Sequence, residues 1–169
     1  MIDPRTAEIM APAWSYESLM AAIQAGADSV YFGVTQLNMR ARAAANFSLW
    51  DLEEIMERCH EAGIKAYLVV NTLLYDHDIK IMHLLVDAAK KHWVDAIIAF
   101  DFATIQYCNE VGIPVHATIQ FSISNYESVA FFAQFTNRVV LARELTVPQI
   151  KAIHERILKE NLLGREWRL

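Results

Sequence analysis

One pattern recurs six times along this sequence and constrains its fold more than any other feature. Each unit has a short apolar run rich in strand-forming residues, then an amphipathic stretch with helical spacing. The expected strands are Glu8–Ala11, Ser29–Gly33, Lys65–Asn71, Ala96–Asp101, Val115–Gln120 and Arg138–Ala142. The expected helices are Tyr16–Ala25, Leu49–Ala62, Ile79–His92, Phe102–Val111, Asn125–Phe135 and Val147–Asn161. Strands that alternate with helices over short links predict a parallel sheet with right-handed crossovers.

Local signals mark several helix ends. Three residue pairs have the spacing of capping boxes, namely Ser48 with Asp51, Ser124 with Glu127, and Thr146 with Gln149. Gly26, Gly63 and Gly112 fall just past expected helix ends, where a left-handed cap favours a residue without Cβ. These signals support the division of the chain into strand–helix units.

Two sheet forms are compatible with this pattern: an open doubly wound sheet, or part of a closed barrel. No glycine-rich phosphate loop follows the first strand, where Pro12, Ala13 and Trp14 stand instead. Helices of similar length at a steady repeat favour the barrel. A complete eight-unit barrel needs about 250 residues, whereas this chain has 169. We therefore expect an α/β fold: a single domain, residues 1–169, forming an incomplete parallel (β/α) TIM-type barrel.

Composition narrows the function classes. Hydrophobic residues make up 54% of the chain, which fits a sheet covered on both faces or a surface that meets a partner. The net charge of −5 argues against general nucleic-acid binding. Cys59 and Cys108 lie far apart without ligand-type spacing, so neither a disulfide scaffold nor a metal site is expected. Without a signal-peptide pattern or a bilayer-length apolar run, we expect a cytoplasmic protein and no membrane partner.

Parallel barrels place their working residues at the carboxyl ends of the strands. The polar residues that follow the expected strands are therefore candidate substrate-binding residues. They are Asn38, Arg40, Arg42, Asn46, Asn71, Asp101, Arg143 and Glu144. The alternative is that strand ends are polar because they meet water or cap helices.

The fifth strand carries the strongest single signal. His116, Thr118 and Gln120 alternate with apolar residues and would share one face of a strand expected to be apolar on both. Such a row needs hydrogen-bond partners or a ligand, and the alternative is a polar layer inside the barrel satisfied by water. Because His116 is the one histidine on an expected strand, it is the candidate catalytic residue for proton transfer.

The loop from Thr35 to Phe47 contains Arg40 and Arg42 but no acidic residue. Two guanidinium groups could hold a carboxylate or a phosphate. Alternatively, both lie on the surface and pair with acidic residues elsewhere. We expect any RNA binding by this chain to be weak, salt-sensitive and confined to this loop.

Several motifs occur in the order found in one known family. They are Met10-Ala11-Pro12-Ala13, Ala25-Gly26-Ala27-Asp28-Ser29-Val30-Tyr31-Phe32-Gly33, Asn38-x-Arg40-x-Arg42, Ala45-Asn46-Phe47-Ser48, Val70-Asn71-Thr72, His116-x-Thr118-x-Gln120 and Val140-Leu141-Ala142-Arg143-Glu144-Leu145. From about Ile9 onward the chain thus resembles the collagenase-like peptidases of family U32. The resemblance implies a barrel domain and kinship with proteins needed for hydroxylation of tRNA or ribosomal RNA bases. The family's historical label is protease, but no nucleophile–base arrangement of a known protease is recognisable here.

The chain departs from the family pattern in two places. Trp14 stands where relatives commonly have glycine, so its indole could fill space that a substrate would use. The family's His-Gly-Ala strand and the cysteines that ligate an iron–sulfur cluster are not found. The resemblance therefore implies that the last barrel units are missing, that this chain holds no cofactor, and that it is inactive alone.

An alternative function needs no chemistry at all. An open six-strand sheet leaves unpaired backbone groups at its first and last strands. The chain could then be a non-catalytic binding or assembly module. Its partner would be the missing C-terminal part or a second copy.

Overall fold

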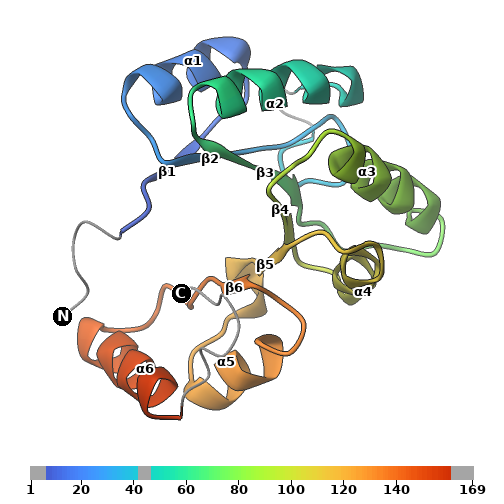
Figure 1. The fold of residues 1–169 in the computed structure, drawn as a ribbon. Coiled ribbons are helices and arrows are strands. Elements are labelled where there is room, and N and C mark those ends of the chain that lie inside the picture. The colour runs from blue at the N-terminus through green and yellow to red at the C-terminus, as the bar shows by residue number, and fades with distance from the viewer. Residues whose placement is uncertain (1–6, 42–46, 161–169) are drawn as a thin grey trace.

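The computed structural model describes residues 7–41 and 47–160. Six parallel strands follow one another in chain order in one sheet. They are β1 (Met10–Pro12), β2 (Ser29–Phe32), β3 (Lys65–Val70), β4 (Ala96–Ala99), β5 (Val115–Ala117) and β6 (Arg138–Val139). The sheet curls into an arc, as the ribbon in Figure 1 shows.

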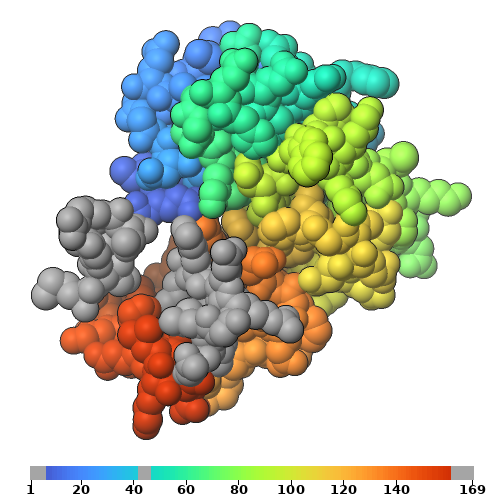
Figure 2. Space-filling view, viewed as in Figure 1, coloured from blue at the N-terminus to red at the C-terminus, as the bar shows by residue number. Residues whose placement is uncertain are grey.

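Helices connect the strands and cover the outer face of the arc (Figure 1). They are α1 (Tyr16–Gln24), α2 (Leu52–Glu61), α3 (Ile79–Lys91), α4 (Phe102–Val111), α5 (Tyr126–Phe132) and α6 (Val147–Lys159), with short 3₁₀ helices η2 (Leu49–Asp51) and η3 (Ile119–Phe121). The first units lie at one end of the molecule and the last units at the other (Figure 2). The incomplete six-unit barrel expected from the sequence is thus confirmed.

Alternate strand residues face opposite sides of the sheet. On β3, Leu68 and Val70 are buried in the core between sheet and helices. Tyr67 and Val69 are buried too, but on the inner face of the arc, outside that core cluster. The residues that β3 presents to the barrel interior are therefore the odd-numbered ones.

Two of the predicted capping boxes are confirmed, and the third is wrong. Ser48 with Asp51 and Thr146 with Gln149 form reciprocal side-chain and backbone hydrogen bonds. At α5 the cap is Asn125, whose Oδ1 accepts a hydrogen bond from the Ser128 amide at 2.9 Å. Ser124 lies one residue too early, because Asn125 is the extended residue at which the chain turns into the helix.

The predicted strand Val115–Gln120 extends past the observed β5, which ends at Ala117. Its ladder with β4 stops at the pair Ala99–Ala117, so no neighbouring strand is left to pair with residues beyond it. Thr118 still donates its amide to Ala99 O at 3.1 Å, and the chain then turns into η3. Gln120 therefore does not continue the row of His116 and Thr118 along a strand.

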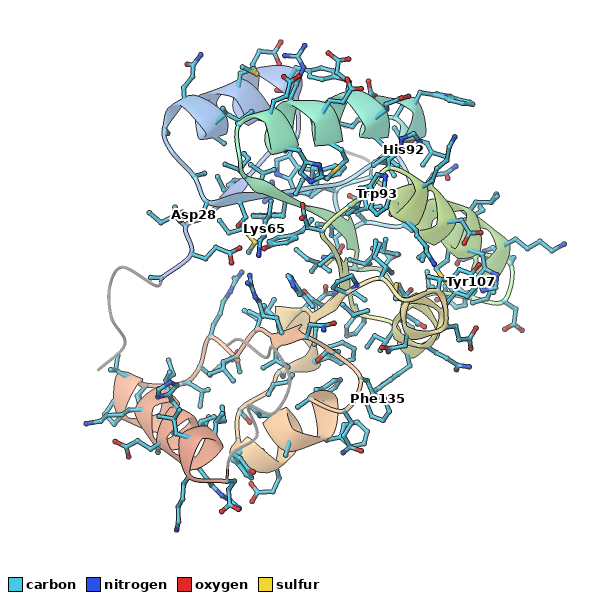
Figure 3. The ribbon with its side chains drawn as sticks, viewed as in Figure 1. Asp28, Lys65, His92, Trp93, Tyr107 and Phe135 are labelled. Carbon is cyan, nitrogen blue, oxygen red and sulfur yellow. The ribbon has the colours of Figure 1, made fainter. Side chains whose placement is uncertain are left out.

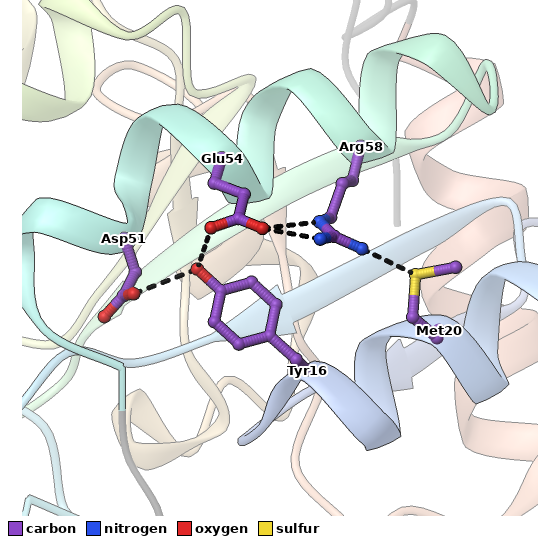
Figure 4. Close-up of polar contacts among 5 residues, drawn as sticks. All are labelled: Tyr16, Met20, Asp51, Glu54 and Arg58. Carbon is purple, nitrogen blue, oxygen red and sulfur yellow. Dashed lines mark hydrogen bonds and ion pairs between the residues drawn. The ribbon is translucent and has the colours of Figure 1, made fainter.

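Helices α1 and α2 are joined by a polar contact on the outer surface (Figure 4). The Tyr16 hydroxyl lies 2.9 Å from Asp51 Oδ1 and 3.0 Å from Glu54 Oε2. Burial and these two carboxylates raise the pKa of Tyr16, so the phenol stays protonated. Arg58 extends the contact, since its Nε donates to Glu54 Oε1 at 3.0 Å. None of the helices in the described ranges is long and apolar enough to cross a membrane.

Candidate functional site

The interior of the arc is polar at the end where the strands begin. Asp28, just before β2, and Lys65, the first residue of β3, mark this end in Figure 3. Here the Glu8 carboxylate accepts hydrogen bonds from Ser29 Oγ at 2.6 Å and from the Tyr67 hydroxyl at 2.7 Å. Arg138 adds a two-pronged ion pair, with Nη2–Oε2 at 2.7 Å and Nη1–Oε1 at 3.2 Å. We call Glu8, Ser29, Tyr67 and Arg138 the interior cluster.

The interior cluster holds Glu8 ionised. Burial alone raises the pKa of this carboxyl, but the hydrogen bonds from Arg138, Ser29 and Tyr67 outweigh burial and lower the pKa to about 2. The Arg138 guanidinium also lies over the Tyr67 ring, 5.6 Å from its centroid. Because Glu8 precedes β1 and Arg138 begins β6, the pair spans the arc from its first strand to its last.

His116 lies beside this cluster on β5 and is 8% exposed. Its ring packs edge-on against Tyr67, with centroids 4.7 Å apart. Burial, and then the positive charge of Arg138, lowers the pKa of His116 to about 3. A base with that pKa is poorly matched to proton transfer near neutral pH. The neutral imidazole is better suited to binding a ligand by hydrogen bonds.

A second group of polar residues gathers at the carboxyl end of the strands. The side chain of Asn71, which follows β3, accepts a hydrogen bond from the Met39 amide at 3.1 Å. Its main-chain oxygen accepts one from Gln120 Nε2 at 3.1 Å. The segments after β2, β3 and β5 are thereby tied together. We call Trp14, Asn38, Arg40, Asn71 and Gln120 the carboxyl-end cluster.

Asn38 folds the loop after β2 into this cluster. It is buried, its Oδ1 accepts a hydrogen bond from the Arg40 amide at 2.9 Å, and its Nδ2 donates to Val34 O. Gly33 permits the close approach, because a Cβ there would lie 2.8 Å from Asn38 Cγ and 2.9 Å from the Trp14 ring. The Arg40 guanidinium stacks over that ring, 4.9 Å from its centroid.

Two polar atoms of the carboxyl-end cluster are buried without a hydrogen-bond partner among the residues described. They are Nε1 of Trp14, a donor, and Oε1 of Gln120, an acceptor. Oγ1 of Thr72, next to Asn71, is in the same state. An unsatisfied buried polar atom costs about 1–3 kcal/mol. A ligand that reached both atoms would need an acceptor for Trp14 Nε1 and a donor for Gln120 Oε1.

The remaining predicted site residues lie in different surroundings. Thr118 is buried at the end of β5. Asp101 caps α4 through the Ala103 amide at 2.9 Å and also accepts from the Leu74 amide at 3.2 Å, so it serves the local fold. Arg143 and Glu144 are exposed in the turn after β6. Arg42 and Asn46 lie outside the described residues.

Sequence reasoning missed Glu8, Tyr67 and Arg138 as interior residues, and it noted Trp14 only as a bulky side chain that could fill substrate space. A signal existed for Glu8 and Arg138. Glu8 and Arg138 are charged residues within expected strands of a sheet that should be apolar on both faces. Tyr67 could not be predicted in this way, because the sequence does not show which face of β3 points into the barrel; the structure shows it, since Leu68 and Val70 pack under the helices and Tyr67 does not.

The cysteines of this chain do not suit an iron–sulfur cluster. Cys59 and Cys108 are free, fully buried in the hydrophobic core, and on different helices. Burial raises the pKa of each thiol to about 12, which disfavours the thiolate that a metal needs. Within residues 7–41 and 47–160, no group of three His, Cys, Asp or Glu side chains could hold a metal ion.

A parallel β/α arc of this kind is part of a (β/α) barrel. Proteins of this class have their active sites at the carboxyl ends of the strands, where this chain also carries polar groups. Comparison with known proteins gives the family within that class. The model of peptidase family U32 matches residues 14–162, and the chain belongs to this family. The solved structure of the U32 peptidase Mk0906 superimposes with a TM-score of 0.72 at 14% identity, over 89% of this chain and 65% of that one.

Three curated relatives have different names. A collagenase of Porphyromonas gingivalis is 55% identical over 93% of this chain. The 23S rRNA 5-hydroxycytidine synthase of Escherichia coli is 35% identical over 88% of it, and tRNA hydroxylation protein P1 of Bacillus subtilis 31% over 89%. The matched parts cover 38%, 22% and 36% of those proteins. The family resemblance expected from the motifs is confirmed, and so is the kinship with RNA-hydroxylation proteins.

Proposed function

We propose that this chain forms the substrate-binding part of a family U32 barrel and that the carboxyl-end cluster binds a base of an RNA. The observation that carries the proposal is the pair of unsatisfied buried atoms, Trp14 Nε1 and Gln120 Oε1, in one cluster. The edge of a nucleobase carries both acceptors and donors, so it could pair with both atoms.

The charge and shape of the cluster support the same ligand. The Arg40 guanidinium on the Trp14 ring offers a planar cationic surface, which suits base stacking and phosphate binding. Relatives named for RNA hydroxylation support it as well. Chemistry on the base would need groups outside this chain, since His116 with a pKa of about 3 is a weak base. We therefore expect binding without turnover.

The test is a calorimetric titration of the chain with cytidine monophosphate and with uridine monophosphate. Arg40→Ala and Gln120→Ala should each weaken binding by about three- to thirtyfold, because each removes one stacking or hydrogen-bonding group. Lys151→Ala is the matched control, since this exposed lysine lies on α6 and pairs with Glu155. Unchanged affinity in both cluster variants would contradict the proposal.

Peptide binding is the second candidate, favoured by the 55% identity with a collagenase. It predicts that a collagen-type peptide, rather than a nucleotide, loses affinity in the same two variants. Assembly is the third: β1 and β6 each pair with a single neighbouring strand in the described structure, so both have a free edge. A stable monomer at micromolar concentration would count against assembly. A cytoplasmic location belongs to the proposal and is supported by the two free thiols.

A further inference from the structure

Each of the first four α-helices is followed by a residue in the left-handed conformation, and after one of them this residue is not glycine. A left-handed glycine follows α1, α2 and α4 within two residues; these are Gly26, Gly63 and Gly112, with φ of +77°, +71° and +76°. The equivalent residue past α3 is Trp93, with φ of +59°. Figure 3 shows Trp93 and His92 together at this end of α3.

The hydrogen bonds around Trp93 follow the same pattern as those around Gly26 and Gly63. The Trp93 amide donates to Lys90 O at 3.2 Å and the Val94 amide to Ala89 O at 2.9 Å. After α2, the amides of Gly63 and Ile64 make the corresponding bonds at 3.0 Å each. The backbone therefore requires a left-handed residue here, which is unfavourable for a bulky side chain.

Burial does not compensate for this strain, because Trp93 is 80% exposed. Glycine would serve the fold better at this position, as it does in the other three units. A strained and exposed indole is thus unexplained by folding, and such outliers point to a function.

The surroundings of Trp93 supply positive charge. An open groove of about 650 Å³ runs between the end of α3 and residues 112–114, and Trp93, Lys90 and Lys91 line it. The two positive charges of Lys90 and Lys91 in the last turn of α3 exceed the partial negative charge, about half a unit, at the C-terminus of that helix. Lys90 Nζ donates to Val111 O, whereas Lys91 has no ion pair among the described residues.

The two acidic residues of the groove are already engaged. Asp87 accepts a hydrogen bond from the Tyr107 hydroxyl at 2.9 Å. Asp95 accepts one from the Ala66 amide at 2.8 Å and lies 3.2 Å from His60 Nε2. Both carboxylates therefore already accept hydrogen bonds from neighbouring groups, and the lining as a whole carries two lysines and two aspartates.

We propose that Trp93, with Lys90 and Lys91, forms a stacking site for single-stranded RNA at the amino end of the barrel. A base stacks on the exposed indole and the two ammonium groups meet the flanking phosphates. This site is separate from the carboxyl-end cluster and from the Arg40 loop, so the proposal departs from the expectation that RNA binding is confined to that loop. The choice of RNA over another polyanion rests on the proposed function.

The experiment measures binding of a fluorescently labelled six-nucleotide uridine RNA by anisotropy, together with thermal unfolding of each variant. Trp93→Gly should weaken binding by about five- to a hundredfold and raise the melting temperature by a few degrees, since it relieves the left-handed strain. Trp93→Phe keeps a stacking ring and should retain most of the affinity. Lys91→Glu should weaken binding and make it less sensitive to salt.

Trp50→Ala is the matched control, because Trp50 is 91% exposed on η2, away from the groove. Equal losses in Trp50→Ala and Trp93→Gly would mean non-specific stacking and would overturn the proposal. So would unchanged affinity in Trp93→Gly, no binding by the original chain, a lowered melting temperature in Trp93→Gly, or a groove that binds only protein. Loss in Trp93→Gly with none in Arg40→Ala would support this site while contradicting the proposed carboxyl-end function.

Discussion

The ion pair between Glu8 and Arg138 is the residue-scale feature with the largest expected effect on stability. Both side chains are largely buried, at 16% and 15% exposed. Replacing Arg138 with Met would leave an ionised carboxylate without its partner inside the barrel. We expect a loss of about 2–4 kcal/mol in the free energy of unfolding, measured by urea titration.

A second Arg–Glu pair provides the control for that measurement. Arg156 and Glu127 are 2.6 Å apart, but their side chains are 48% and 67% exposed. Water screens such a pair, so Arg156→Met should change stability little. Similar losses of unfolding free energy in Arg138→Met and Arg156→Met would show that burial of the Glu8–Arg138 pair does not increase its contribution to stability.

The buried His116 makes stability depend on pH. Its pKa is about 3 in the folded chain and 6.5 when unperturbed, so the unfolded chain binds the proton more readily. Stability should therefore be complete above pH 6.5 and fall as pH drops toward 3, by at most about 1.4 kcal/mol per unit. Glu8, with a folded pKa of about 2 and a usual value of 4.5, adds its own loss only below pH 4.5.

The measurement is the free energy of unfolding at pH 7 and at pH 5, for the original chain and for His116→Gln. The original chain should lose stability between these values, and the variant should lose clearly less. Parallel curves would indicate that His116 takes up its proton in the folded state.

At the scale of elements, the caps can be tested one by one. Asn125→Ala should destabilise the chain by about 1 kcal/mol, because the Ser128 amide loses its acceptor. Ser124→Ala should have little effect, since that hydroxyl does not cap α5. Thermal unfolding of the two variants distinguishes the observed cap from the one that the sequence suggested.

Helices could be predicted from this sequence more closely than strands could. Phe102–Val111 was expected and is found unchanged, because its capping aspartate and following glycine are both local signals. Strand ends depend on partners. The expected Val115–Gln120 stops at Ala117 where β4 ends, and the expected Arg138–Ala142 forms a ladder only over two residues. No local pattern carries that information.

At the scale of the whole molecule, the class of fold and the end of the barrel with polar loops could be inferred from the repeat alone. The contacts of the site could not. Asn38 and Asn71 were expected to bind substrate, which stays a prediction, and the structure shows that their hydrogen bonds hold the loop after β2 in place. The interior cluster joins residues from four strands or their approaches, so it depends on how the arc curls.

The span of the Glu8–Arg138 contact has a consequence for the order of folding. Every strand pairs with the next one in the sequence, so each unit can dock on the one before it as soon as it is made. The contact between residues 8 and 138, by contrast, cannot form until the sixth strand has joined. We therefore expect it to form in the last step of assembly and to be absent from an early transition state. Weakening this contact should therefore raise the unfolding rate and leave the folding rate almost unchanged.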